Sequence, residues 1–250
     1  MQGSVAIVKS IALSLGSPWH TRRVQSGTRA ARRAANEERI KATARRLLAA
    51  HGAGGLSLRE VAREMGQSSS ALYRYFPNRD DLLTALIVDA YNDLGLATEL
   101  AESHVRRTDH VGRWRVACLA IRRWALAHPH EYALIFGSPV PGYRAPEATV
   151  AAASRVTTVI ATVVADRYRT RPVASSSDSS LAGMLEWEAV AAVMPAVPRE
   201  IAVRAILAWT EVFGFLSFEL FGHLVGSVRD AEAAFERLIE ETAAYLGVDV

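Results

Sequence analysis

The chain has 250 residues, of which 50% are hydrophobic and 22% are charged, which excludes a wholly disordered protein and allows a large buried core. The single cysteine excludes an internal disulfide, and no Cys/His cluster has zinc spacing, so we expect no cofactor and a cytoplasmic protein. No apolar run reaches the roughly 18–20 residues that cross a bilayer. The stretch Ile11–Leu15 is too short for a signal segment, so we expect no membrane association.

The net charge of +3 is unevenly distributed along the chain. Residues 1–90 contain 14 Lys and Arg against 7 Asp and Glu, whereas residues 91–250 contain 15 against 19. The basic excess is densest at Arg22, Arg23, Arg29, Arg32, Arg33, Arg39, Lys41, Arg45 and Arg46. This end of the protein should attract a polyanion, for which nucleic acid is the obvious candidate, although a solvated basic tail explains the charge equally well.

The beginning of the chain shows no residue pattern typical of a helix or a strand. Residues 1–30 show no sustained periodicity and predict a flexible basic arm. From Ala34 onward the apolar residues recur at helical spacing on one face: Ile40, Ala44, Leu47 and Leu48. We expect this helix to end at His51, with Gly52 in the left-handed conformation that glycine adopts most readily.

Two short helices are predicted next. Ser57 and Glu60 form a capping box, in which the Ser57 hydroxyl accepts from the Glu60 amide and the Glu60 carboxylate reaches back. The first short helix ends at Gly66, and its buried stripe is Leu58, Val61, Ala62 and Met65. Ser68 is the best N-cap of the second, whose apolar residues lie within 71–76. Two short helices with a glycine at the turn are typical of a DNA-reading helix-turn-helix.

The rest of the chain reads as helix throughout. Asn78 caps a fourth helix, with Asp80 and Asp81 in its first turn, where negative charge suits the helix dipole. Further helices are predicted at 109–127, 129–136, 146–169, 179–194, 198–225 and 230–246. No alternating strand pattern competes with them. The expected fold is all-α, with a three-helix helix-turn-helix domain at 31–80 and a helical body at 81–250.

The helix-turn-helix region carries a specific resemblance. Leu56–Gly66 reads Leu-Ser-Leu-Arg-Glu-Val-Ala-Arg-Glu-Met-Gly, and Ser70–Leu83 reads Ser-Ala-Leu-Tyr-Arg-Tyr-Phe-Pro-Asn-Arg-Asp-Asp-Leu-Leu. From about Arg39 to Leu86 the chain resembles the DNA-binding domain of the TetR family of transcriptional regulators. Gln67 stands where the family usually has an apolar residue, and Ser70-Ala71 replaces a frequent Gly-Thr. These departures do not change the expected fold, but they prevent a prediction of the operator sequence.

The resemblance also implies which side chains contact DNA. The implied phosphate contacts are Ser57, Tyr73 and Arg79. Tyr75 is a weaker candidate, because hydrophobic packing explains it equally well. The implied contacts to base edges are Arg59, Ser68, Ser69 and Ser70. The alternatives are a plain surface position for Arg59 and simple helix capping for the serines.

The stretch 124–143 is similar to a C-terminal domain type named for a Trp-His-Gly signature. By resemblance, the body binds a small effector, and the many aromatic residues indicate an apolar or aromatic one. The candidate lining residues are Trp114, Trp124, Tyr132, Phe136, Trp187, Trp209 and Phe213. Each of them is otherwise an ordinary core aromatic.

Three further residues of the body are candidate chemical sites. His128 and His130 flank a proline and have no further ligand nearby in the sequence, so a capping or pocket role is favoured over a metal site. Cys118 is expected to be a buried thiol. The alternative is a redox sensor whose pKa is lowered by Arg115 and Arg122.

The last two predicted helices suggest an oligomer. The segment 198–225 is apolar round most of its circumference, so it should be buried on more than one side. The final helix carries Ala234, Leu238 and Tyr245 on one strip. By resemblance, these two helices pair with those of a second copy, and a homodimer implies a nearly palindromic operator on double-stranded DNA.

The leading hypothesis is therefore a dimeric DNA-binding transcriptional regulator, most often a repressor in this family, which a small ligand releases from its operator. An all-α enzyme is the runner-up, but the sequence has no G-x-S-x-G, H-E-x-x-H or glycine-rich phosphate loop. A helical adaptor or membrane-surface protein remains a third alternative, because the basic arm includes the apolar region Val5–Leu15.

Overall fold

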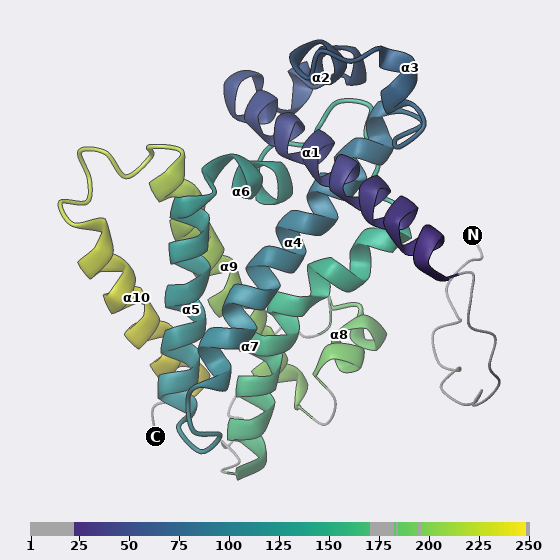
Figure 1. Ribbon diagram of the computed structural model, residues 1–250. Helices are drawn as coiled ribbons and strands as arrows, with labels where there is room; N and C mark the ends of the chain where they lie inside the picture. The colour runs from purple at the N-terminus through teal and green to yellow at the C-terminus, as the bar shows by residue number, and fades with distance from the viewer. Residues whose placement is uncertain (1–22, 171–182, 184, 195–196, 249–250) are drawn as a thin grey trace. The chain divides into compact units, whose positions relative to one another are not determined.

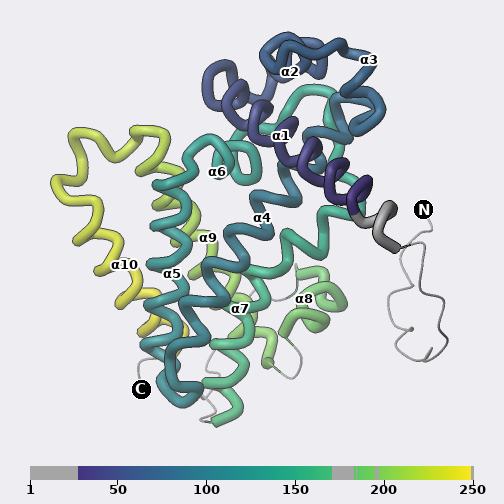
Figure 2. Tube along the Cα trace, viewed as in Figure 1, coloured from purple at the N-terminus to yellow at the C-terminus, as the bar shows by residue number. Residues whose placement is uncertain are grey.

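The computed structural model describes residues 23–170, 183, 185–194 and 197–248. By its internal contacts the chain divides into two compact units, Met1–Arg39 and Ile40–Val250. All regular structure among the described residues is helical, which confirms the all-α fold (Figures 1 and 2). The first 22 residues of the predicted arm, with Arg22 and the region Val5–Leu15, lie outside the described residues.

Helix α1 (Arg23–Gly55) begins at Arg23, whereas the sequence predicted a start at Ala34. The predicted arm is therefore helical over 23–30, and its boundary at residue 30 is wrong. Alanine and arginine have high intrinsic helix propensity, so this stretch forms a helix without an apolar stripe. An ion pair between Arg33 Nε and Glu37 Oε1 at 2.8 Å, one helical turn apart, adds to its stability.

Gly52 interrupts α1 with a backbone φ of 69° and ψ of 173°. Glycine adopts a positive φ at little cost, whereas a side chain there would be strained. The continuous helix ends at His51 as predicted, because residues 53–55 only add a separate turn beyond the break.

A compact apolar cluster holds the helix-turn-helix together. The second half of α1 packs there with α2 (Leu58–Glu64), α3 (Ser69–Leu72) and the start of α4 (Arg79–Ser103). Its buried members are Ile40, Ala44, Leu47, Leu56, Leu58, Val61, Ala62, Leu72, Phe76, Leu82, Leu83 and Leu86. Six residues of the two predicted apolar stripes are thus buried together: Ile40, Ala44, Leu47, Leu58, Val61 and Ala62. Met65 is only partly buried against this cluster, and Leu48 is buried but is not one of its members.

Helix α4 belongs to both the helix-turn-helix and the body. It begins as predicted, with Asn78 Oδ1 accepting from the Asp81 amide at 2.8 Å. Its first turns contribute Leu82 to the apolar cluster of the helix-turn-helix, and its later turns contribute Ala90 and Leu94 to the core of the body. Any displacement of α4 within the body is therefore carried to the helix-turn-helix.

The body contains α5 (His110–Ala127), α6 (Pro129–Phe136), the 3-10 turn η1 (Glu147–Thr149), α7 (Val150–Thr170), α8 (Trp187–Val193), α9 (Arg199–Leu220) and α10 (Ala231–Leu246). The predicted segments agree closely for α5, α6, α7 and α10. Helix α8 begins at Trp187 rather than at residue 179, and residues 179–182 and 184 lie outside the described residues. Helix α9 stops at Leu220 rather than at residue 225, because Gly222 takes a φ of 80°.

Two helical stretches of the body are strongly apolar. Glu147–Thr170 and Arg199–Leu220 are long and apolar enough, by length and composition alone, to cross a membrane. Both instead contribute buried residues such as Ile160, Val164 and Val212 to the core of the body. Their place in a protein core accounts for their hydropathy.

A buried ionic cluster joins the C-terminal ends of α4 and α7 to the first turn of α5. Arg113 is fully buried, and it donates from Nε to Glu102 at 2.5 Å and from Nη1 to Asp166 at 2.8 Å. Burial by itself raises the pKa of Asp166, but hydrogen bonds from Arg113 and Arg169 outweigh it, so the pKa lies below its ordinary value. The sequence pattern did not reveal this cluster, because its members are far apart in the chain.

Candidate nucleic-acid interface and ligand cavities

The start of α2 is fixed by Ser57. Its Oγ accepts from the Glu60 amide at 3.2 Å, which is the first half of the predicted capping box. The Glu60 carboxylate does not complete the box; it accepts from Arg63 at 3.4 Å and lies 3.9 Å from His51 Nε2. Arg59, on the same helix, is exposed, as both a base contact and a plain surface residue require.

The tip of α3 presents three serines. Ser68 occupies the N-cap position, but its side chain makes no cap hydrogen bond; its Oγ pairs with Ser70 Oγ at 3.0 Å. Ser68 and Ser70 are exposed and Ser69 is half-buried, whereas Leu72 is completely buried in the apolar cluster. Capping alone therefore does not explain the three hydroxyls. A short helix anchored at one end and polar at the other is suited to approach a groove of DNA.

The two tyrosines after α3 differ in their surroundings. Tyr73 is 43% exposed, which leaves its phenol accessible to a phosphate. Tyr75 is half-buried and packs against the apolar cluster, which favours the packing alternative for it. Helix α3 itself covers only Ser69–Leu72, and residues 73–75 form turns, so the helix predicted through Phe76 is shorter than expected.

Arg79 has a structural role that the sequence did not predict. Its Nε donates to the Leu56 carbonyl at 2.9 Å and its Nη2 donates to the Ala53 carbonyl at 2.8 Å. These carbonyls lie in the turn that joins α1 to α2, so Arg79 ties the start of α4 to that turn. The phosphate contact implied for Arg79 stays a prediction, in which only the rest of the guanidinium would face DNA.

The predicted aromatic residues of the body lie mostly in its core. Trp114 Nε1 donates to Thr242 Oγ1 at 3.2 Å, and the Tyr132 hydroxyl donates to the Phe213 carbonyl at 3.1 Å. Trp124 is buried and stacks on the ring of His128, and Trp187 lies under the guanidinium of Arg199. Phe136 packs against Tyr91, Tyr132 and Phe213.

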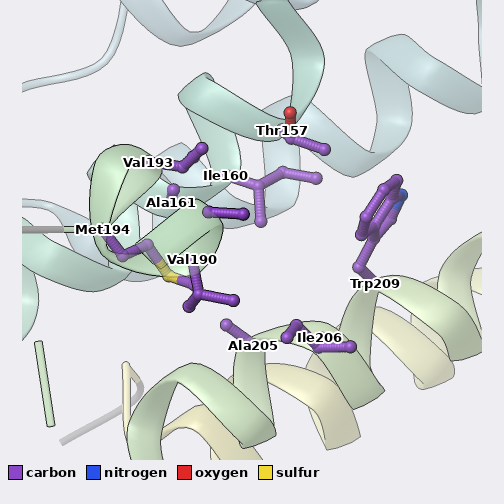
Figure 3. Close-up of a pocket in the computed structure, with 10 residues that line it drawn as sticks. Thr157, Ile160, Ala161, Val190, Val193, Met194, Ala205, Ile206 and Trp209 are labelled. Atoms are coloured by element: carbon purple, nitrogen blue, oxygen red, sulfur yellow. The ribbon is translucent and has the colours of Figure 1, made fainter. Parts of the chain in front are cut away.

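Of the seven aromatic candidates, only Trp209 lies on the wall of a cavity described below. The first cavity, of about 300 Å³, lies between α7, α8 and α9 (Figure 3). It is lined by Thr157, Ile160, Ala161, Ala189, Val190, Val193, Met194, Ala205, Ile206 and Trp209. Each of the three helices contributes one alanine to this wall, namely Ala161, Ala189 and Ala205, and a small side chain fills less of the space between helices than an aromatic one does. The pocket role predicted for the aromatic residues stays a prediction, and small residues on facing helices are a further sequence signal for such a wall.

A second cavity, of about 490 Å³, adjoins the first. It is lined by residues of α4, α6, α7 and α9, and by the segment that joins α6 to η1. Thr157 and Trp209 belong to the walls of both cavities. Among the residues that the structure describes, no charged side chain lines either one.

The wall of the second cavity is also in contact with the helix-turn-helix. Leu134, Val140 and Tyr143 line this cavity and pack against the apolar cluster of the helix-turn-helix. The Tyr143 hydroxyl shares a hydrogen bond of 3.0 Å with Thr84 Oγ1 on α4. A change in the shape of the cavity therefore has a direct packing route to the helix-turn-helix.

Charged groups tie the same parts together. Asp89 of α4 lies 2.6 Å from Arg45 and 2.7 Å from Lys41, both on α1. Arg45 Nε also lies 3.7 Å from Glu131 of α6. These partly buried ion pairs connect α1 to α4 and α6.

Cys118 and the two histidines do not form a chemical site in the described structure. Cys118 is completely buried, and burial raises the pKa of its thiol far above the ordinary value. Arg122 is engaged with Glu219 at 2.6 Å and Arg115 with Glu236 at 2.8 Å, so neither cation lowers that pKa. His128 Nδ1 lies 3.0 Å from the Trp124 carbonyl, in keeping with the capping role predicted for it.

Comparison with known proteins identifies the family. A family model described as "Bacterial regulatory proteins, tetR family" matches residues 40–86, and one described as "Tetracyclin repressor-like, C-terminal domain" matches residues 114–242. The HTH-type transcriptional regulator Rv1816 of Mycobacterium tuberculosis is 37% identical over 190 residues, which cover 74% of this chain and 81% of that protein. The chain belongs to the TetR family. It is a transcriptional regulator with a DNA-binding domain, not an enzyme.

Solved structures agree with this assignment to the TetR family. The crystal structure of protein SCO4313 has a TM-score of 0.72 and 32% identity, and covers 86% of this chain and 98% of that one. A Rhodococcus sp. RHA1 protein of unknown function has a TM-score of 0.61 at 22% identity, covers 84% of this chain and 93% of that one, and shows the shared fold alone. The C-terminal match is to the tetracyclin repressor-like model, so the Trp-His-Gly subtype is not confirmed.

Proposed function

We propose that this TetR-family regulator acts as a homodimer in the cytoplasm, binds a nearly palindromic operator as a repressor, and is released from it by a small, mostly apolar effector. The observation that carries the proposal is the tip of α3, where Ser68 and Ser70 are exposed while Leu72 is completely buried. This geometry supports base contacts from Arg59 and the three serines, and phosphate contacts from Ser57 and Tyr73.

Release from the operator depends on how differently the effector binds to two forms of the protein. An effector shifts the equilibrium only by the difference between its affinities for the operator-binding form and the released form. The second cavity supports such a difference, because its wall residues Leu134 and Val140 also pack against the helix-turn-helix. An effector that alters this wall acts on the spacing of the two reading heads.

The reading role of α3 predicts a change of sequence preference without a change of stability. We expect Ser70→Arg to alter the operator selected from random DNA, because a long cation replaces a short hydroxyl at the tip of the helix. The free energy of unfolding should stay within about 0.5 kcal/mol of wild type, since the site is exposed. Selection of bound sequences and thermal denaturation measure the two effects.

Ser103→Arg is the matched control, because Ser103 is also exposed and makes a single local hydrogen bond, to the Leu100 carbonyl. It should select the same operator as wild type. An unchanged selection profile for Ser70→Arg would contradict the assignment of α3 as the reading helix.

The homodimer proposal rests on apolar side chains left exposed near the end of α9. Phe218 is 54% exposed, Phe221 44% and Val225 85%. Tyr245 on α10 is 42% exposed, but it lies beside Arg204 near the other end of α9 and is not part of this group; Leu238 is half-buried. Neighbouring exposed apolar residues of this kind indicate a surface that a partner covers, and a second copy would present the same surface across a two-fold axis.

We expect Phe218→Glu to raise the dimer dissociation constant by about 10- to 100-fold, because a buried charge replaces an aromatic contact in the proposed interface. Operator affinity should fall with it, since two heads no longer bind together. Analytical ultracentrifugation gives the dissociation constant. Val150→Glu, at a 61% exposed apolar residue on α7, is the control and should leave the dimer intact. A monomeric wild type would refute the homodimer outright.

A further inference from the structure

The wall shared by the two cavities contains an unsatisfied donor. Trp209 Nε1 is buried and has no hydrogen-bond partner among the described residues. Figure 3 shows the indole at the edge of the first cavity, with its nitrogen on the side of the ring that faces away from the other labelled residues. A buried N–H without an acceptor costs free energy, which a ligand oxygen would recover.

The chemistry of the walls restricts what the cavities can hold. The first cavity exposes almost only carbon, from residues such as Ile160, Val190 and Met194. The second adds the hydroxyl groups of Tyr91, Ser138, Tyr143, Thr149 and Ser154, whereas no cation and no carboxylate of the described residues lines it. An ionised group bound there would lose its hydration without gaining a counter-ion, which is strongly unfavourable.

We infer that the effector is a neutral amphipathic molecule that spans both cavities. Its apolar part fills the cavity between α7, α8 and α9, and an acceptor oxygen on the side of the Trp209 ring that faces away from this cavity receives the hydrogen bond from Nε1. Its polar end lies in the second cavity, against the segment that packs on the helix-turn-helix. This inference rests on the ligand-regulated function proposed above and adds to it the class of the ligand and the residue that recognises it.

Two probes of equal chain length separate a neutral acceptor from a charge: 2-undecanone and undecanoate. Isothermal titration of each probe into the full-length protein at neutral pH measures the affinities. We expect the ketone to bind at least about tenfold more tightly than the carboxylate, because the carboxylate must be buried without a partner. Equal affinities, a preference for undecanoate, or no binding of either probe would overturn the inference.

Variants of the protein test where the ketone binds. Trp209→Phe keeps the ring and removes the donor, so ketone affinity should fall by about five- to tenfold. Trp187→Phe is the matched control, because Trp187 lies outside both cavities and against Arg199; it should bind as wild type does. Ala161→Leu reduces the first cavity and should also weaken binding. Unchanged ketone affinity in Trp209→Phe would overturn the role given to this side chain.

The affinity of the ligand-free protein for its selected operator is measured on the same samples. Failure of the ligand-free protein to bind any DNA refutes the proposed function, whereas normal DNA binding without a preference for the ketone refutes only the ligand class. Circular dichroism shows whether each variant keeps its helices. If Ala161→Leu does not fold, Trp209→Phe alone decides the test, because it preserves the size and shape of the ring.

Discussion

Replacing Arg79 with lysine is expected to impair DNA binding as much as replacing it with methionine. The guanidinium spans two carbonyls, those of Leu56 and Ala53, at 2.9 and 2.8 Å. An ammonium group is a single point of charge and does not reproduce this planar two-bond geometry. Either change should weaken the local stability of the helix-turn-helix by about 2–3 kcal/mol, and hydrogen exchange in residues 53–66 measures that loss.

The lysine variant separates the two roles considered for Arg79. If the side chain mainly contacted phosphate, Arg79→Lys would keep both the affinity for DNA and its salt dependence, and only Arg79→Met would lose them. Retained binding in the lysine variant would therefore refute the structural role. Arg63→Lys is the control, because the Arg63 side chain is 81% exposed and its contact with Glu60 is long, at 3.4 Å. It should leave local stability unchanged.

Arg113→Met is expected to lower the free energy of unfolding by about 3–5 kcal/mol, because it leaves two carboxylates without their buried partner. The Arg113 side chain is completely buried, and the side chains of Glu102 and Asp166 are each 12% exposed. Chemical denaturation measures the loss. The double variant with Asp166→Asn should lose less than the sum of the two single changes, because the carboxylate that loses Arg113 is removed with it.

Arg115→Met provides the contrast on the same helix. Arg115 pairs with Glu236 at 2.8 Å, but both side chains are nearly half exposed, at 49% and 45%. Solvent screens such a pair, so the change should cost no more than about 1 kcal/mol. An equal loss of stability in the two variants would refute the special role of the buried cluster.

The same cluster makes a prediction about pH. The pKa of Asp166 is lowered in the folded protein from its ordinary 3.8, with burial opposing the shift and hydrogen bonds from Arg113 and Arg169 producing it. Its contribution to stability is therefore complete above about pH 4 and is lost as pH falls through the lower, folded pKa. The difference in stability between wild type and Arg113→Met should shrink in that acid range. A difference that grows on acidification would contradict this sign.

Interactions between residues close together in the chain made much of the helix-turn-helix region predictable. The apolar spacing of Leu58, Val61 and Ala62, the cap at Ser57 and the glycine at 52 each act within a few residues, and each was found where the sequence placed it. The start of α1 was missed for the opposite reason. An exposed helix has no face to bury, so hydrophobic periodicity carries no information about where it begins.

The candidate effector site was not predictable in the same way. Among the aromatic candidates, Trp114 and Tyr132 point inward and are completely buried, whereas Trp209 lies on a wall between two cavities. All three occupy apolar positions on helices, so their patterns along the chain are alike. What distinguishes Trp209 is the presence of alanines on the facing helices, which is a property of packing rather than of local sequence.

The amino-acid sequence by itself determined the all-helical class and the position of the helix-turn-helix, because helix periodicity, capping and turn glycines act over a few residues. The family was indicated separately, by the resemblance of the motifs at 56–66 and 70–83. The tertiary structure alone decided that Arg79 ties α4 to the turn before α2, that Arg113 is buried among carboxylates, and that the wall of one cavity packs on the DNA-reading head. These contacts join residues far apart in the chain, and they depend on which side chains meet once the helices have packed.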